Sequence, residues 1–327
     1  MGHAGHSFPM WMPSDPPSFG RLLAWQLQPI PVLDALCVLA LVAYLFAVLR
    51  LRRQSVRWPL FRTVSFTVGS VSILLVVSTG IGGYSMQLFS VHMAQHMVLS
   101  MVAPVLLLLG APVTLALRVL RPRGLLRRAL VGVLHSRCVR FFSSGLVSTP
   151  LFVLSLFGLY FTSAFDFLMS SWWGHFYMLV HFIAVGLLYY WPILGVDPNP
   201  RRPQPLTRLG MLVIAMPFHA FFGIALMSSR STVTTSLMAP QAWGIDAMWD
   251  QYVAGGIAWA TGEIPALIIA VVIARQWARS ETRLAKSHDR QADRDGDAAL
   301  RRYNAKLAEL AARASTDTSS GRGLTPT

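Results

Sequence analysis

The stretch that decides the fold is 92-HMAQHMVLSMVAPVLLLLGAPVTLAL-117, an apolar run without a single Asp, Glu, Lys or Arg. As a helix with a rise of about 1.5 Å per residue, it is long enough to cross the roughly 30 Å hydrocarbon core of a membrane. His92 and His96 stand four residues apart at its start and share one helical face. Met93 and Met97 form the adjacent stripe. Imidazole and thioether together suit a soft ion such as Cu(I).

Similar apolar runs recur along almost the whole chain. The 327 residues are 54% hydrophobic and only 13% charged, whereas a soluble domain has roughly 25% charged residues. Each run is long enough to span a bilayer. The sequence therefore predicts an all-α integral membrane protein, a bundle of seven transmembrane helices near 32–49, 63–81, 91–117, 145–165, 174–194, 209–228 and 250–274.

The positive charge is distributed unevenly between the two sides of this bundle. The net charge is +14, and one set of alternate loops carries arginine clusters within 50–62, 118–140 and 201–208. The other set carries only Arg21 and Arg230. Because basic residues mark cytoplasmic loops, we expect the N-terminus outside the cytoplasm and the C-terminus inside. This distribution explains the charge without a nucleic-acid partner.

Three regions follow from this topology. Residues 1–31 form an extracytoplasmic arm, residues 32–275 the membrane domain, and residues 276–327 a cytoplasmic tail. In the tail we expect a helix around 297–314 and disorder over 315–327. The arm either collects metal or is simply a flexible terminus, and its candidate ligands are His3, His6, Met10 and Met12.

Histidines from several spans reach similar depths. His92 and His96 lie in the outer part of the third span, and His181 lies about as deep in the fifth. His219 lies near the middle of the sixth span. His175, six residues before His181, points in another direction near the surface, so we exclude it from the site.

Glu263 lies at bilayer depth in the seventh predicted span. An ionisable residue there costs about 2.5 to 3.5 kcal/mol on insertion scales, so it should face a partner, a cavity or a bound metal. Gly255, Gly256 and Gly262 in the same span permit close backbone approach and predict an internally packed helix. Asp250 lies on another face, and we expect it to meet water or Arg230.

These polar groups favour a functional site. For one histidine, the simplest interpretation is a neutral imidazole in an interhelical hydrogen bond worth about 0.6 to 2 kcal/mol. Four histidines on three spans, with methionines beside them, favour a metal or cofactor site. Pro104 and Pro217 permit kinks that open a cavity inside the bundle. We expect no catalytic residue, and the candidate metal ligands are His92, His96, His181, His219, Met93, Met97 and Glu263.

Four ordered sequence blocks strengthen this interpretation. They comprise Phe89–Met97 with Ala103-Pro104 and Gly110–Pro112, His181 with Tyr190–Pro192 and Gly195–Pro198, Pro217–Gly223, and Asp250-Gln251 through Gly255-Gly256 to Gly262–Pro265. Together they resemble the CtaG family of membrane-embedded cytochrome c oxidase assembly factors. The resemblance covers residues 25–275 and implies a role in maturing haem-copper oxidases in the bacterial plasma membrane. It also implies handling of copper, with oxidase subunits as partners and a separate periplasmic copper chaperone as one source of the ion.

Two alternatives stay open at this point. A haem-binding redox protein also uses neutral imidazoles from different helices, although axial ligands approach from opposite haem faces, which argues against an i, i+4 pair. A metal-free scaffold for oxidase subunits would need the histidines only for packing. A retinal protein is excluded, because the only lysines are Lys286 and Lys306, both in the tail.

Overall fold

The computed structural model describes residues 10–199, 203–295 and 298–320. Within these residues every regular element is a helix, apart from an isolated bridge between Trp25 and Thr79. Six helical segments of this part of the chain are long and apolar enough to cross a membrane. They are α2 (Val32–Arg53), α3 (Leu60–Ser78), the α5 to α7 segment (Phe89–Val119), α12 (Trp172–Leu194), α13 (Pro205–Ser228) and the Ala247–Ser287 part of α14 (Ala247–Asp295). The prediction of an all-helical membrane protein is confirmed.

The fourth predicted span is shorter than expected. α10 covers Gly145–Tyr160, or 16 residues, which corresponds to about 24 Å and falls short of the roughly 30 Å hydrocarbon core. The chain turns directly after it, because the Thr162 hydroxyl donates to the Gly158 carbonyl and accepts from the Ala164 amide. The short helix α11 (Ala164–Met169) begins there. The described residues therefore contain six full-length spans and one short apolar helix.

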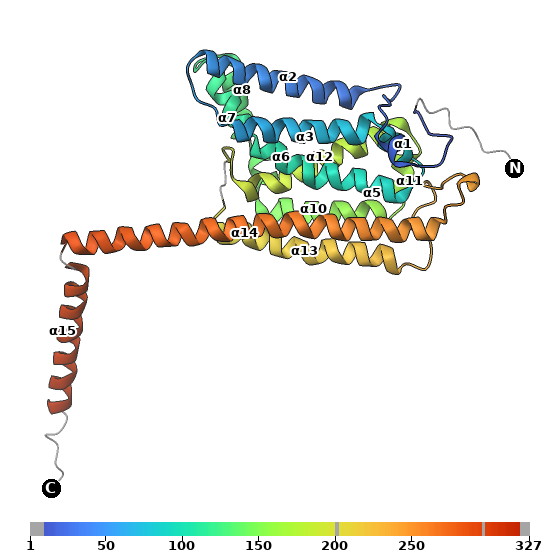
Figure 1. Cartoon of the computed structure of the whole chain (residues 1–327). Helices are drawn as coiled ribbons and strands as arrows, with labels where there is room; N and C mark the ends of the chain where they lie inside the picture. The colour runs from blue at the N-terminus through green and yellow to red at the C-terminus, as the bar shows by residue number, and fades with distance from the viewer. Residues whose placement is uncertain (1–9, 200–202, 296–297, 321–327) are drawn as a thin grey trace, which may run out of the picture. The chain divides into compact units, whose positions relative to one another are not determined.

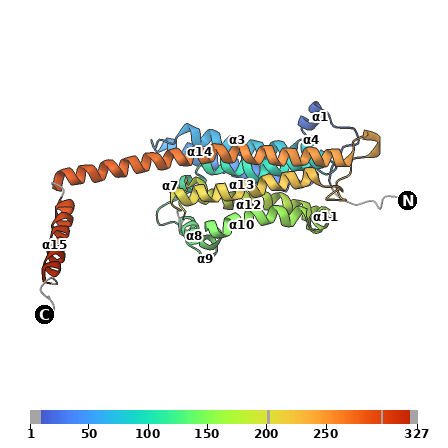
Figure 2. The ribbon, with the colours of Figure 1, turned by 90° about the horizontal axis from the view of Figure 1, so that it is seen from below.

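α12 lies at the centre of the first compact unit, which comprises Met1–Ile273. It packs against α6 (Ala103–Leu109), the turn before α6, α10 and α13, as Figures 1 and 2 show. Gly186 permits this packing, since a Cβ atom there would lie 2.7 Å from Cγ of Pro104 and closer still to the Ser100 carbonyl oxygen. The central position of α12 brings its side chains close to the third span.

The third span is not a regular helix. α5 (Phe89–Met97) continues through one π-helical turn, η1 (Val98–Val102), into α6. Pro104 explains the irregularity, because proline has no N–H to continue the α-helical pattern and the wider turn accommodates it. The irregularity expected at Pro104 is confirmed, whereas Pro217 lies within α13 without ending it.

Glycines let α13 and α14 approach closely. A Cβ atom on Gly223 would lie 2.8 Å from the Gly255 carbonyl oxygen, and one on Gly255 would lie 2.7 Å from the Gly223 carbonyl oxygen. Gly262, seven residues after Gly255 and on the same face, lies directly against the His219 ring. The predicted close approach is confirmed at Gly255 and Gly262 but not at Gly256, where a Cβ atom would meet nothing within 4 Å. The prediction that the whole helix is internal is wrong, because only 29% of its membrane-spanning window is buried.

Asp250 caps the helix that carries the first two histidines. Its carboxylate accepts hydrogen bonds from the backbone N–H of Phe89 at 2.6 Å and of Ser90 at 3.3 Å, and from the Ser90 hydroxyl. Negative charge is favourable at a helix N-terminus, where the backbone N–H groups lack partners. The expectation that Asp250 meets water or Arg230 is wrong, because the start of α5 already occupies its carboxylate.

Asp197 acts in the same way at another helix. It accepts hydrogen bonds from the N–H groups of Val113 and Thr114, at 3.1 and 2.8 Å, and from the Thr114 hydroxyl at 2.6 Å. Burial raises the pKa of Asp197, and these hydrogen bonds oppose that rise. The carboxylate thereby fixes the start of α7 (Pro112–Val119) to the end of α12.

The second compact unit comprises Ala274–Thr327. α14 continues through it to Asp295, and α15 covers Ala298–Ser320. The helical part of the tail is longer than predicted: α14 continues over 276–295, which contain the strong helix formers Arg, Ala, Glu, Lys and Gln, and α15 continues over 315–320, where disorder was expected. His3, His6 and the tail beyond 320 lie outside the described residues. The remaining short helices are α1 (Phe19–Leu23), α4 (Gly80–Tyr84), α8 (Leu125–Leu134), α9 (Arg137–Phe142) and η2 (Gln241–Trp243).

Candidate functional site

Tyr160 joins the two histidines of the third span. Its hydroxyl oxygen lies 3.1 Å from Nε2 of His92 and 2.7 Å from Nδ1 of His96. All three side chains are buried. The i, i+4 spacing on α5 places both imidazoles on one face, as predicted, and the last residue of α10 lies opposite them. Two ring nitrogens therefore converge on a single point inside the bundle.

The hydrogen bonds of this trio constrain its protons. A phenol hydroxyl has one proton, so Tyr160 can donate to one imidazole and must accept from the other. With both rings neutral, one presents an N–H and the other a lone pair to the same oxygen. Tyr160 thus pairs one nitrogen of each ring without any ion, whereas Nδ1 of His92 has no hydrogen-bond partner among the described residues. Sequence reasoning did not identify Tyr160, although a tyrosine at the end of an apolar span and at the depth of the histidines was the available signal.

Aromatic rings enclose the pair. Phe182 of α12 stacks on His96 with ring centroids 3.8 Å apart and an interplanar angle of 21°. Phe165 of α11 meets His92 edge-on, with centroids 5.1 Å apart at 89°. These rings surround the imidazoles with apolar surface, which strengthens any interaction between the nitrogens and a charged ligand.

His219 and His181 both lie within electrostatic range of His96. His219 is buried, and its Nδ1 atom has no hydrogen-bond partner in the part of the chain that the structure describes. A cavity with room for little more than a water molecule lies beside it and is also lined by Met101 and Tyr190. His181 is only partly buried and its ring lies against Tyr177. His96 is therefore the common neighbour of the predicted histidines.

The expectation that His175 lies near the surface is wrong. It is buried rather than near the surface, and it interacts electrostatically with His92. Its Nε2 atom has no hydrogen-bond partner among the described residues. The position of His175 near the start of its helix predicted that its side chain would be exposed. The amino-terminal arm, which covers this end of α12 through Met10 and Gln28, overrides that prediction.

The other predicted ligands are less closely associated with the imidazoles. Met93 and Met97 are buried in the main hydrophobic core, where packing alone accounts for them. Glu263 is partly buried, and its Oε1 atom has no partner among the described residues. Across the described ranges, no three His, Cys, Asp or Glu side chains are grouped as a metal site would need. The structure thus brings together a chain of imidazoles rather than one closed cluster of all seven residues.

Comparisons with known proteins agree with these features. Uncharacterized proteins of Mycobacterium bovis and Mycobacterium tuberculosis are each 41% identical over 322 residues, and one of Mycobacterium leprae is 40% identical over the same length. The alignments cover 93% of this chain and 48% of each relative, so the chain spans about half the length of the curated relatives it matches. No solved structure matches the chain.

A family model covers most of the membrane unit. Residues 42–280 match the model described as cytochrome c oxidase caa3 assembly factor. This match, the bacterial relatives and the six membrane-spanning helices make the protein a multi-pass protein of the bacterial plasma membrane. The chain belongs to the family of cytochrome c oxidase caa3 assembly factors.

Proposed function

We propose that the protein assists the maturation of cytochrome c oxidase by binding Cu(I) within the membrane and delivering it to an oxidase subunit. Family membership supports the assembly role. The convergence of His92 and His96 on one point carries the copper assignment. Neutral imidazoles bind copper, and Cu(I) accepts few ligands, so it does not require a cluster of three or more acidic or imidazole groups.

The Tyr160 hydroxyl occupies the point that the two nitrogens face. In the proposed cycle, a Cu(I) ion displaces the hydroxyl and takes Nε2 of His92 and Nδ1 of His96 as ligands, and the ring that had donated its N–H to Tyr160 moves that proton to its other nitrogen. When the ion leaves, Tyr160 pairs these two nitrogens again, so in both states Nε2 of His92 and Nδ1 of His96 have a partner. His219 and His181, beside His96, are further donors along the path of the ion. The protein itself performs no catalysis in this proposal.

The proposed orientation puts the amino-terminal arm outside the cytoplasm. The arginine-rich loops at 50–62, 118–140 and 201–208 then face the cytoplasm, as basic loops do. This arrangement requires α10 to act as the fourth of seven spans despite its length. Its companion α11 continues the path at the outer end. Copper would reach the site from the outside, from a separate periplasmic chaperone or directly through the arm.

A metal-free scaffold is the second candidate. One observation favours it, namely that Tyr160 hydrogen-bonds to one nitrogen of each imidazole without an ion. In this case the trio would act as a structural link between α5 and α10, and oxidase subunits would bind elsewhere. The haem alternative gains no comparable support, because the cavity beside His219 has room for little more than a water molecule.

Metal binding separates these candidates. The full-length protein, purified in detergent, would be loaded with Cu(I) in competition with a coloured Cu(I) chelator and also scanned for a Soret band. We expect the wild type to retain Cu(I) and the His92→Asn, His96→Asn double variant to lose it. His135→Asn is the matched control, because His135 is exposed and remote in sequence from the spans that carry the site.

Cells grown at limiting copper provide the second readout. If the protein delivers the ion, the double variant should lower the copper content and activity of the oxidase, and added copper should restore both. Unchanged copper binding by the double variant would refute the proposed site. A wild type that binds no copper but is still required for oxidase assembly would favour the scaffold, and a Soret band would favour haem.

A further inference from the structure

A small pocket lies at the end of the bundle where the amino-terminal arm packs. Met10 of the arm, Gln28, Asp34 of α2, Gln95 of α5 and His175 of α12 contribute to its lining. Its volume is about 30 Å³, which is enough for a water molecule or one ion but not for an organic ligand. The pocket is distinct from the point between His92, His96 and Tyr160.

Two buried side chains of this pocket each have a polar atom without a hydrogen-bond partner among the described residues. His175 is 3% exposed and its Nε2 atom has no hydrogen bond among the described residues. Gln95 is 1% exposed; its amide nitrogen donates to the Val76 carbonyl at 2.8 Å, but its Oε1 atom is unpartnered. A polar group that is buried without a partner destabilises the folded protein. This cost suggests that something fills the pocket in the working protein.

The lining favours a cation over an anion. An imidazole lone pair, an amide oxygen, the Asp34 carboxylate and the Met10 thioether are all electron-pair donors, whereas Gln28 supplies the only amide N–H group left unpartnered in this lining. Calcium or magnesium would require several oxygen ligands. The combination of thioether and imidazole instead suits a soft ion.

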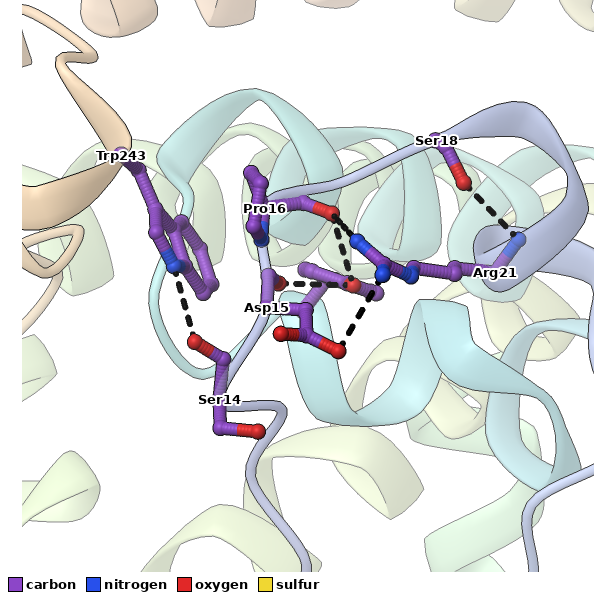
Figure 3. A network of polar contacts seen from close by, with 7 residues as sticks. Ser14, Asp15, Pro16, Ser18, Arg21 and Trp243 are labelled. Atoms are coloured by element: carbon purple, nitrogen blue, oxygen red, sulfur yellow. Dashed lines mark hydrogen bonds and ion pairs between the residues drawn. The ribbon is translucent and has the colours of Figure 1, made fainter.

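The described part of the arm is fixed to the bundle, which keeps Met10 at the pocket. Figure 3 shows the Trp243 indole donating to the Ser14 carbonyl at 3.1 Å, and Arg21 paired with Asp15 at 3.2 Å. The Tyr84 hydroxyl donates to the Asp15 carbonyl at 2.9 Å. The Tyr84 and Trp243 contacts come from α4 and η2, so two separate segments hold the arm, whereas the Arg21–Asp15 pair lies within the arm.

Trp11 anchors the arm beside the pocket itself. Its backbone N–H donates to Oε1 of Gln28 at 3.0 Å. Its ring lies directly against Gly83, where any Cβ atom would overlap it. Over residues 10–31 the arm is therefore a packed cover rather than a loose terminus, and Met10 reaches the pocket as its first described residue.

We propose that this pocket is the receiving site for one Cu(I) ion, with Met10 and His175 as ligands, from which the ion passes to His92 and His96. Gln95, which lines the pocket, directly precedes His96 on α5, so the two sites are neighbours. This proposal rests on the proposed Cu(I) function. It adds an entry site and gives the arm a role as the cover that supplies the thioether.

Stoichiometry of metal binding tests the receiving site. Full-length protein in detergent would be titrated with Ag(I), a redox-stable analogue of Cu(I), and then with Cu(I) itself. We expect Met10→Leu and His175→Asn each to lose one equivalent relative to the wild type. Met12→Leu is the matched control for the arm, because Met12 is 45% exposed and does not line the pocket. His135→Asn is the control for imidazole loss.

The outcomes separate the two proposals. If Met10→Leu and His175→Asn bind as much ion as the wild type, the pocket holds water and the receiving site is refuted. If they lose one equivalent while the His92→Asn, His96→Asn variant loses none, the receiving site stands and the proposed delivery site fails. A wild type that binds no ion refutes both. Met10→Leu keeps the side-chain volume, so its result holds even if His175→Asn fails to fold.

Discussion

Gly262→Ala should damage the protein through one contact. A Cβ atom at Gly262 would meet three atoms of the His219 ring, and even the farthest of them, Cγ, would be only 2.9 Å away. Separations below 3.0 Å force something to move. His219 is buried against α14 and has little freedom to withdraw. Overpacking of this kind costs about 1–3 kcal/mol, and the helix propensity of alanine returns about 0.5–1 kcal/mol.

We therefore expect Gly262→Ala to lower the free energy of unfolding by about 1–2 kcal/mol, measured by reversible unfolding in mixed micelles. Gly256→Ala is the matched control on the same helix, because a Cβ atom there would meet nothing within 4 Å. It should be neutral or stabilising. In a His219→Ala background the obstructing ring is absent, so Gly262→Ala should then cost little, with a coupling free energy of about 1–3 kcal/mol.

Two results would refute this reasoning. One is a Gly262→Ala protein as stable as Gly256→Ala. The other is an equal loss from Gly262→Ala in the wild-type and His219→Ala backgrounds, which would show that the ring is not the obstacle. Cu(I) binding of Gly262→Ala should also weaken if His219 serves as a donor beside His96, and an unchanged affinity would remove His219 from the path of the ion.

Three further outcomes are expected. Tyr160→Phe leaves His92 and His96 without their shared partner and should cost about 1–3 kcal/mol of unfolding free energy without metal. Cu(I) should raise the thermal stability of this variant more than that of the wild type. A variant as stable as the wild type would contradict the bridging role of Tyr160. Asp250→Ala removes the cap of α5 and should cost about 1–2 kcal/mol in the same unfolding assay, whereas no loss would show that the cap contributes nothing. Burial alone would raise the pKa of Asp166, but hydrogen bonds from Thr234 and Ser236 outweigh it and lower the pKa below its ordinary value. The Asp166 carboxylate should therefore stabilise the loop after α13 at neutral pH and lose this effect as the pH falls through the lowered pKa. Proteolysis of the loop should accelerate at acid pH in the wild type and show no such change in Asp166→Asn.

The histidine site illustrates how far sequence patterns reach. Four-residue spacing correctly put His92 and His96 on one face, because helical periodicity is a local property. The same reasoning placed His175 near the surface, where the structure buries it. Depth along one helix does not reveal which other segment covers it. Similarly, Asp250 was expected to meet water, and its true partners at Phe89 and Ser90 are 161 and 160 residues away.

The sequence by itself determined the membrane class and the approximate bounds of most helices. The span predicted at 174–194 is α12 at Trp172–Leu194, because apolar composition over about 20 residues is sufficient to specify a transmembrane helix. Only the tertiary structure decided which polar groups meet. Tyr160 reaches the two imidazoles from another helix, and Met10 reaches the pocket of His175 from the arm. Such contacts depend on how the helices are rotated and spaced. Close glycine contacts and interhelical packing set this arrangement, and no local sequence pattern records it.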